Sequence, residues 1–429
     1  MKLSRLVMSS AALALVAGMQ AQADTIAIID GHVHTLGEAG ELEGATVLIR
    51  DGEIVEVGED VSVPEGARVI DADGYPVTPG LVDAYGSIGL VEVGAVGHTR
   101  DAAFDGREYT AAFDVTDAIN PASQLIPVNR IEGITRAAVA PVHGGEGNLL
   151  AGQGAVIDLS GGADSITRTP AGMYGSLGTG GAAQAGGSRA GALLQLREAF
   201  QDAQDYAANR DAWEQGSRRD YALGRLDLDA LGPVLAGEMP LVLEVNRASD
   251  IRVALRLADE WDLDLVILGG AEAWKEAERL AAADVPVLLD PTQNLPGSFD
   301  HLGATRKNAP RLYEAGVDFA FATGESHNAR NITQAAGNAV AYGLPWEAAF
   351  EALTSRPAEI WGIADRVGRL EPGMEADVVI WDGDPLEVTS FPIQVLIHGE
   401  EIPMESRHTR LRDRYSDLED QLLPRAYRK

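Results

Sequence analysis

The feature that most restricts the fold of this chain is a series of short apolar segments alternating with amphipathic ones, from Gly80 to about Ala364. The segments LDLVILGG and VPVLLDP have the length of buried strands, and AEAWKEAERLAAA has helical spacing. In SDIRVALRLADEW the apolar residues form one helical face, with Ser249 or Asp250 placed to cap its start. Repeated strand–helix units of this number predict a (β/α)8 TIM-like barrel, in which chemistry occurs at the carboxyl ends of the strands.

The segments outside this series have other patterns. Residues 25–78 alternate apolar and polar residues, and Asp51-Gly52 between two alternating runs predicts a hairpin. The stretch from Asp365 returns to short β segments. Residues 160–192 are rich in glycine, and we interpret them as a mobile loop or lid followed by a helical insertion.

The first 23 residues have the parts of a secretory signal peptide. Lys2 and Arg5 precede an apolar run, and Ala21-Gln22-Ala23 is a small-residue cleavage site. We therefore expect cleavage after Ala23 and export to the periplasm. The apolar run is too short to span a bilayer, so no membrane association is expected after cleavage.

Charge and composition exclude several function classes. The 34 basic and 65 acidic residues give a formal net charge of −31, which disfavours binding to nucleic acid. The sequence has no cysteine, which excludes disulfides, thiolate ligands and a cysteine nucleophile. It also has no G-x-S-x-G motif for a serine nucleophile.

Nearly all of the chain after residue 23 carries a family likeness, strongest in ALTSRPAEIWGIADRVGRLEPGMEADVVIWDGDPLE. Further parts of it are VTPGLVDA, DAINP, GQGAVIDL and ASDIRVALRLADEWDLDLVI. The chain resembles the amidohydrolase superfamily and, within it, the imidazolonepropionase-like and related exported amidohydrolases. The resemblance implies a barrel over residues 79–364, with the Gly-rich loop and helical insertion at about 160–240. It also implies a small β-sandwich formed by residues 24–78 and 365–405, and a C-terminal tail at 406–429.

The resemblance implies hydrolysis of a C–N bond in a cyclic amide, imide, amidine or small peptide, by water that one or two divalent metals activate. The family's ligands are an H-x-H pair on strand 1, histidines after strands 5 and 6, and an aspartate after strand 8. Strand residues at i and i+2 share a face, so both imidazoles of the pair enter the barrel.

This chain has other residues at all five ligand positions. Glu244 lies two residues before the strand-5 position, and Glu325 follows the strand-8 position. The resemblance therefore implies that the usual metal site has been lost. The five positions carry Tyr85 and Ser87 at the H-x-H pair, Asn246 after strand 5, Gly269 after strand 6 and Gly324 after strand 8.

Of the eight histidines, His327 in GESHNARN has the best position for function, since it follows strand 8. His143 follows an early strand. For each of them, a polar loop residue with one hydrogen bond is an equally simple interpretation. His32 and His34 have the H-x-H spacing, but they precede the barrel, which favours a surface pair over metal ligands.

Three hypotheses remain for function. The first is a non-catalytic or altered homologue, a pseudoenzyme for which no cofactor is expected and which binds a small amide-like or peptide-like molecule, or pairs with an active amidohydrolase relative. The second is an active C–N hydrolase with a metal-free site, or with one divalent metal at a rebuilt carboxylate site. The third is a purely structural or interaction role, and an oligomer is compatible with each. The candidate catalytic residues are Tyr85, Glu244, Asn246, Glu325 and His327.

The rebuilt metal site would draw on carboxylates near the expected strand ends, namely Asp83, Glu244, Glu272 and Glu325. For Asp83, a side chain that points out of the barrel is the simpler interpretation. For Tyr85, the simpler interpretation is a ring that fills the space of the lost imidazoles and metal.

Overall fold

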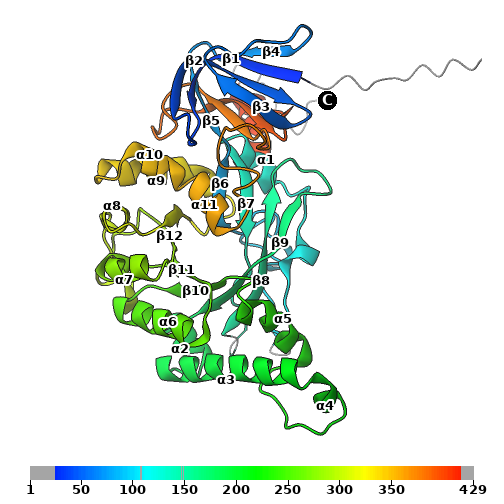
Figure 1. Cartoon of the computed structure of the whole chain (residues 1–429), viewed down its shortest axis with the longest axis vertical. Helices are drawn as coiled ribbons and strands as arrows, with labels where there is room; N and C mark the ends of the chain where they lie inside the picture. Colours follow the sequence, from blue (N-terminus) through cyan, green and yellow to red (C-terminus); the bar gives the residue numbers. More distant parts are fainter. Residues whose placement is uncertain (1–24, 107–108, 146, 148, 417–429) are drawn as a thin grey trace, which may run out of the picture.

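The structure, a computed structural model of the chain, describes residues 25–106, 109–145, 147 and 149–416. The expected signal peptide and its cleavage site lie outside these residues, as does the end of the expected tail. The described residues form a β domain, at the top of Figure 1, and a barrel below it. No helix among them is long and apolar enough to cross a bilayer.

Eight strands form the barrel, hydrogen-bonded in the order β13-β12-β11-β10-β9-β8-β7-β6, and β13 lies next to β6, so the sheet is nearly closed. This confirms the predicted TIM-like barrel, with one difference. β8 is antiparallel to β7 and β9, whereas the other neighbouring strands are parallel. The strands are β6 (Leu81–Gly86), β7 (Ile134–Val139), β8 (Leu150–Asp158), β9 (Ile166–Ser176), β10 (Leu241–Val245), β11 (Leu265–Gly269), β12 (Val287–Leu289) and β13 (Phe319–Phe321).

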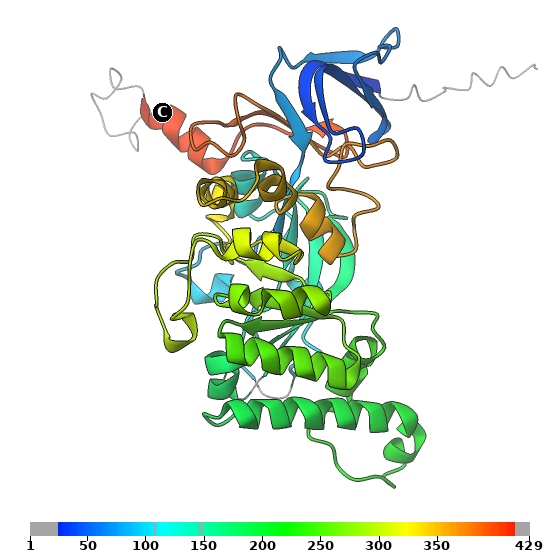
Figure 2. The ribbon, with the colours of Figure 1, turned by 60° about the vertical axis from the view of Figure 1, so that its left-hand side comes forward.

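Helices connect the strands and cover one side of the sheet, as Figures 1 and 2 show. α1 (Leu125–Arg130) precedes β7, and α6 (Ala248–Trp261), α7 (Ala277–Ala282) and α8 (Asn308–Glu314) alternate with the strands from β10 to β13. The predicted helical insertion lies between β9 and β10 and comprises α2 (Gly178–Gln184), α3 (Arg189–Ala208), α4 (Arg210–Glu214) and α5 (Arg225–Leu235). The remaining helices are α9 (Ile332–Ala341), α10 (Trp346–Glu351), α11 (Ser355–Ile360) and α12 (Arg407–Ser416).

The prediction of a loop or lid over residues 160–192 is wrong. Residues 166–176 are the barrel strand β9, and residues 178–184 are helix α2. The glycines of β9 serve close packing and not mobility. A Cβ on Gly172 would lie 3.1 Å from Val242 and 3.2 Å from the Trp361 ring, and one on Gly175 would lie 3.2 Å from Leu243.

The amphipathic pattern of α6 is confirmed, but its predicted cap is wrong. Arg247 stands at the N-cap, and no side chain there accepts a capping hydrogen bond. Asp250 is occupied elsewhere, in ion pairs with Arg189 at 3.1 Å and Arg247 at 2.9 Å. The predicted apolar face packs inward, with Ile251, Ala254, Leu257 and Ala258 buried and Leu255 partly buried.

The β domain is one sheet built from both ends of the chain, in the order β16-β15-β14-β5-β1-β2-β3, with β4 paired to β1. This confirms a sheet domain beside the barrel, and its described strands form one sheet in place of the predicted β-sandwich. The predicted hairpin joins β2 to β3, where Asp51 and Gly52 have φ of 53° and 86°, as a type I′ turn requires. The strands are β1 (Thr25–His34), β2 (Glu41–Arg50), β3 (Glu53–Gly58), β4 (Arg68–Asp71), β5 (Pro76–Pro79), β14 (Val378–Trp381), β15 (Pro392–Ile397) and β16 (Glu400–Glu401).

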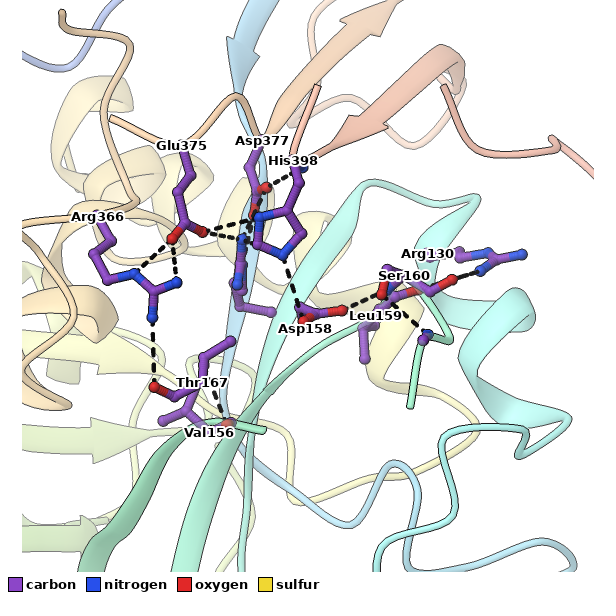
Figure 3. Close-up of polar contacts among 12 residues, drawn as sticks. Arg130, Val156, Asp158, Leu159, Ser160, Thr167, Arg366, Glu375, Asp377 and His398 are labelled. Atoms are coloured by element: carbon purple, nitrogen blue, oxygen red, sulfur yellow. Dashed lines mark hydrogen bonds and ion pairs between the residues drawn. The ribbon is translucent and has the colours of Figure 1, made fainter. Parts of the chain in front are cut away.

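A buried ionic network joins the barrel to the β domain (Figure 3). Arg136 of β7 is only 1% exposed and donates to Asp377 at 2.6 and 3.0 Å and to Glu375 at 2.6 Å. His398 lies between Glu375, at 3.2 Å, and Asp158 of β8, at 3.4 Å. Charges from both domains therefore balance one another at the contact.

This network predicts a pH dependence of stability. Hydrogen bonds to Asp158 and Glu375 raise the pKa of His398 to about 9, against the effect of burial. The stabilisation from charged His398 is therefore complete below the ordinary value of 6.5 and is lost as the pH rises through about 9.

The test replaces His398 with asparagine, because asparagine tolerates the positive φ of 52° at this position. In urea unfolding, we expect wild type to lose about 1 to 2 kcal/mol more than His398→Asn between pH 6 and pH 9.5, after allowance for a side chain that is 37% exposed. Parallel pH curves for the two proteins would contradict this.

Candidate site at the barrel mouth

A polar pocket of about 220 Å³ lies at the carboxyl ends of the barrel strands. Three of the five candidate catalytic residues line it: Tyr85 from β6, Glu244 from the end of β10, and Asn246 just after β10. Four of the five positions that align with the family's ligands line it, since Gly269 and Gly324 join Tyr85 and Asn246. The other lining residues are Leu268, Leu288, Asp290, Gln293, His301, Ala322 and Thr323.

Tyr85 belongs to an aromatic column inside the barrel. Its ring centroid lies 5.9 Å from that of Tyr174, which in turn lies 6.2 Å from Trp361. The Trp361 indole N–H donates to the Ala84 carbonyl at 3.0 Å, which fixes the column to β6. Burial, together with the nearby charge of Glu244, raises the pKa of Tyr85 to about 12, so the phenol is neutral at physiological pH.

At the positions that align with the family's ligands, a glycine packs against a larger side chain in two places. A Cβ on Gly324 would lie 3.5 Å from the Tyr85 ring, so the ring occupies the space beside the strand-8 position. A Cβ on Gly269 would lie 2.6 Å from Oδ1 of Asn246, and Gly269 has a φ of 90°. Small residues therefore face larger ones across the mouth, and the larger side chains pack against the glycines.

Beneath Tyr85 lies Asp83, which is fully buried. Neither carboxylate oxygen has a hydrogen-bond partner of ordinary geometry among the described residues. Burial raises the pKa of Asp83 to about 8, and the Tyr85 backbone N–H offsets this only in part. The expectation that Asp83 points out of the barrel is wrong, because the side chain is fully buried and its charge acts on Tyr174 of the aromatic column.

Glu244 is the carboxylate most open to the pocket. It reaches solvent through the mouth, yet the surrounding wall raises its pKa by desolvation, and His301 counteracts this electrostatically. His301 ends a short 3-10 helix (Phe299–His301), where Ser298 Oγ lies 2.6 Å from its Nδ1. Asp290 accepts from the Thr292 backbone at 2.8 Å and keeps its place at the rim.

The remaining candidates do not line this pocket. Nε2 of His327 lies 3.3 Å from Nε2 of His408 in α12, so the two residues form a histidine pair at the surface. Glu325 and Ser87 lie outside the lining residues as well. Glu272 holds loops together, since it accepts from Lys275 at 2.7 Å and from the Gly303 backbone at 2.8 Å.

Sequence reasoning missed both titratable residues that line the pocket besides Tyr85 and Glu244. Asp290 directly follows β12 in VLLDP, so its place at a strand end was a usable signal. His301 lies twelve residues after the end of β12, in a loop whose path the sequence pattern does not indicate.

The mouth does not fit the metal that the family resemblance implies. Among the described residues, two groups of three His, Asp or Glu side chains have ligand atoms within 4.8 Å of one another, and neither lies at the mouth. The four carboxylates of the rebuilt-site hypothesis do not form such a group. The side chains of the mouth therefore support no catalytic step through a bound metal.

Comparisons with known proteins agree with this architecture. The amidohydrolase family profile matches residues 264–404. The chain is 26% identical over 387 residues to amidohydrolase tasK of Hapsidospora irregularis, which covers 82% of this chain and 39% of that protein. It is 31% identical over 170 residues to an imidazolonepropionase of Maricaulis maris, covering 38% of this chain and 41% of that protein. The chain thus spans about two fifths of the length of these relatives.

Longer matches cover most of both chains. An imidazolonepropionase of Acidiphilium cryptum is 26% identical over 410 residues, covering 86% of this chain and 93% of that protein. A solved amidohydrolase structure from Thermotoga maritima has a TM-score of 0.79 at 29% identity, covering 88% of this chain and 99% of that one. Fold and comparisons thus agree on an amidohydrolase-type barrel. The chain is similar to proteins of the amidohydrolase superfamily, with imidazolonepropionases among its relatives at low identity.

Proposed function

We propose that this protein binds a small amide- or amine-bearing molecule at the barrel mouth and does not carry out the metal-dependent hydrolysis of its superfamily. The observation that carries this proposal is the mutual fit of Tyr85 with Gly324 and of Asn246 with Gly269. These contacts lie at the positions that align with the usual ligand set, and a pocket of about 220 Å³ remains open beside them. The pocket is a binding site without the means to hold the superfamily's metal.

The chemistry of the lining indicates the class of ligand. Glu244 and Asp290 supply acceptors, and Asn246 and Gln293 supply both donors and acceptors. Among the described residues, no lysine or arginine lines the pocket. A small molecule with N–H donors, either a cationic amine or an amide, therefore complements the site better than an anion.

The test uses glycinamide and glycylglycine as probes in ligand-observed NMR. We expect wild type to bind glycinamide and Glu244→Gln to bind it about tenfold or more weakly, because a charge-assisted hydrogen bond is lost. The matched control is Glu238→Gln, an exposed glutamate just before the start of β10. It should bind as wild type does. Equal binding by Glu244→Gln, or none by wild type, would contradict the proposal.

The raised pKa of Glu244 favours a second candidate, a metal-free C–N hydrolase in which Glu244 takes a proton from the attacking water. Ammonia release from glycinamide separates the two. We expect none above the buffer rate, with or without added zinc. Release that Glu244→Gln abolishes without any zinc requirement would support the second candidate. Release that requires zinc would overturn the proposal.

A further inference from the structure

Of the two groups of candidate ligands among the described residues, one is already neutralised by a side chain. Glu375, Asp377 and His398 surround the Arg136 guanidinium in the interdomain network. The other group comprises His32, His34 and Glu41 in the β domain. In the part of the chain that the structure describes, no lysine or arginine lines the pocket beside this second group.

The strands themselves bring these three side chains together. His32 and His34 are two residues apart on β1, so they point to one face of the sheet. His34 pairs directly with Glu41 of the antiparallel strand β2, and directly opposed residues also share a face. Glu41 contacts Nε2 of His32, and Glu43 Oε1 lies 3.6 Å from the same nitrogen. The hairpin alone therefore fixes two imidazoles beside carboxylates.

The group opens into a pocket of about 340 Å³ between the β domain and the barrel. His34 lies 4.8 Å, ring centroid to ring centroid, from Trp346, the first residue of α10. The Trp346 indole N–H donates to Asp384 at 2.9 Å, and Asp384 and Glu347 also line the pocket. Three carboxylates in one lining favour a cation there.

His34 lacks the partner that a half-buried imidazole ordinarily has. No described residue hydrogen-bonds either of its ring nitrogens, and its ring lies 4.5 Å from that of His32. An imidazole nitrogen without a hydrogen-bond partner is available to bind a metal ion.

We propose that His32, His34 and Glu41 bind one divalent transition metal ion, zinc by donor type, with the fourth position open to the pocket. Two imidazoles and a carboxylate form a known zinc donor set, with metal–donor distances of about 2.0–2.2 Å. Ligand atoms already within 4.8 Å of one another reach that arrangement by small side-chain rotations. The site replaces the surface pair expected from sequence, and it is independent of the function proposed for the barrel mouth.

The test is zinc binding to metal-stripped protein by isothermal titration calorimetry, with cobalt absorption as a probe of coordination. We expect one equivalent of zinc in wild type, with affinity reduced about 100-fold or more in His32→Gln and His34→Gln. The matched controls are His408→Gln, in the surface pair, and His301→Gln, at the barrel mouth. Both should bind zinc as wild type does, and cobalt should give the intense visible bands of a tetrahedral site.

Far-UV circular dichroism establishes that each variant is folded. As a second measurement, zinc should raise the melting temperature of wild type and leave that of folded His34→Gln unchanged. The proposal is overturned if wild type shows no saturable zinc binding. Unchanged affinity in the His32→Gln/His34→Gln double variant, or loss of zinc in His301→Gln, would overturn it as well.

Discussion

Replacing Arg136 with methionine is expected to lower the free energy of unfolding by about 3 to 5 kcal/mol. The guanidinium is 1% exposed and makes a two-pronged contact with Asp377 and a further bond to Glu375. Its removal leaves two carboxylates at a domain contact without their main cationic partner. Of the described cationic side chains, His398 and Arg366 remain paired with Glu375. The cost comes mainly from these stranded charges.

The measurement is urea unfolding at pH 6, where the network is fully charged. Arg197→Met is the matched control, since Arg197 makes a comparable two-pronged contact with Glu260 on the surface. There we expect a loss below about 1 kcal/mol. Equal losses in the two variants would contradict this, because they would show that the buried Arg136 contacts stabilise the fold no more than the surface contact of Arg197.

Replacing Asp83 with asparagine is expected to raise the free energy of unfolding at high pH. The pKa of Asp83 rises from 3.8 in the unfolded chain to about 8 in the folded barrel. Its contribution to stability is therefore complete below pH 3.8 and is lost as the pH rises through about 8. Asparagine has a similar shape and does not ionise, so this loss disappears.

At about 1.4 kcal/mol per pKa unit, wild type should lose roughly 4 kcal/mol more than Asp83→Asn between pH 5 and pH 8.5. Unfolding in urea at the two pH values measures this difference. Asp164→Asn, an exposed aspartate in the β8–β9 connection, should follow the wild-type pH curve. A wild-type curve parallel to that of Asp83→Asn would mean that Asp83 is ionised and solvated when folded.

The barrel and the two-ended β domain were predictable because local patterns and the family resemblance gave the same result. The Asp51-Gly52 turn and the apolar face of α6 show how far such patterns extend. The prediction of a loop over residues 160–192 failed, because the sequence does not distinguish glycines that permit close packing from glycines that permit flexible turns. The distinction depends on Val242 and Trp361, which are distant in the chain.

For the mouth, strand periodicity and family alignment found Tyr85, Glu244 and Asn246, since their positions follow from the strands alone. His301 and the true place of His327 depend on loop paths, which no sequence period determines. The inward direction of Asp83 was available from the i, i+2 rule that placed Tyr85.

The most direct test of the proposal that the barrel mouth holds no metal is anomalous X-ray diffraction at the zinc edge, from crystals of the protein grown with zinc. We expect no peak in the pocket lined by Tyr85, Glu244 and Asn246, and one peak between His32, His34 and Glu41. A missing second peak would overturn only the β-domain site. A fully occupied zinc ion in the mouth pocket would contradict the loss of the superfamily's metal site and restore the hydrolase interpretation.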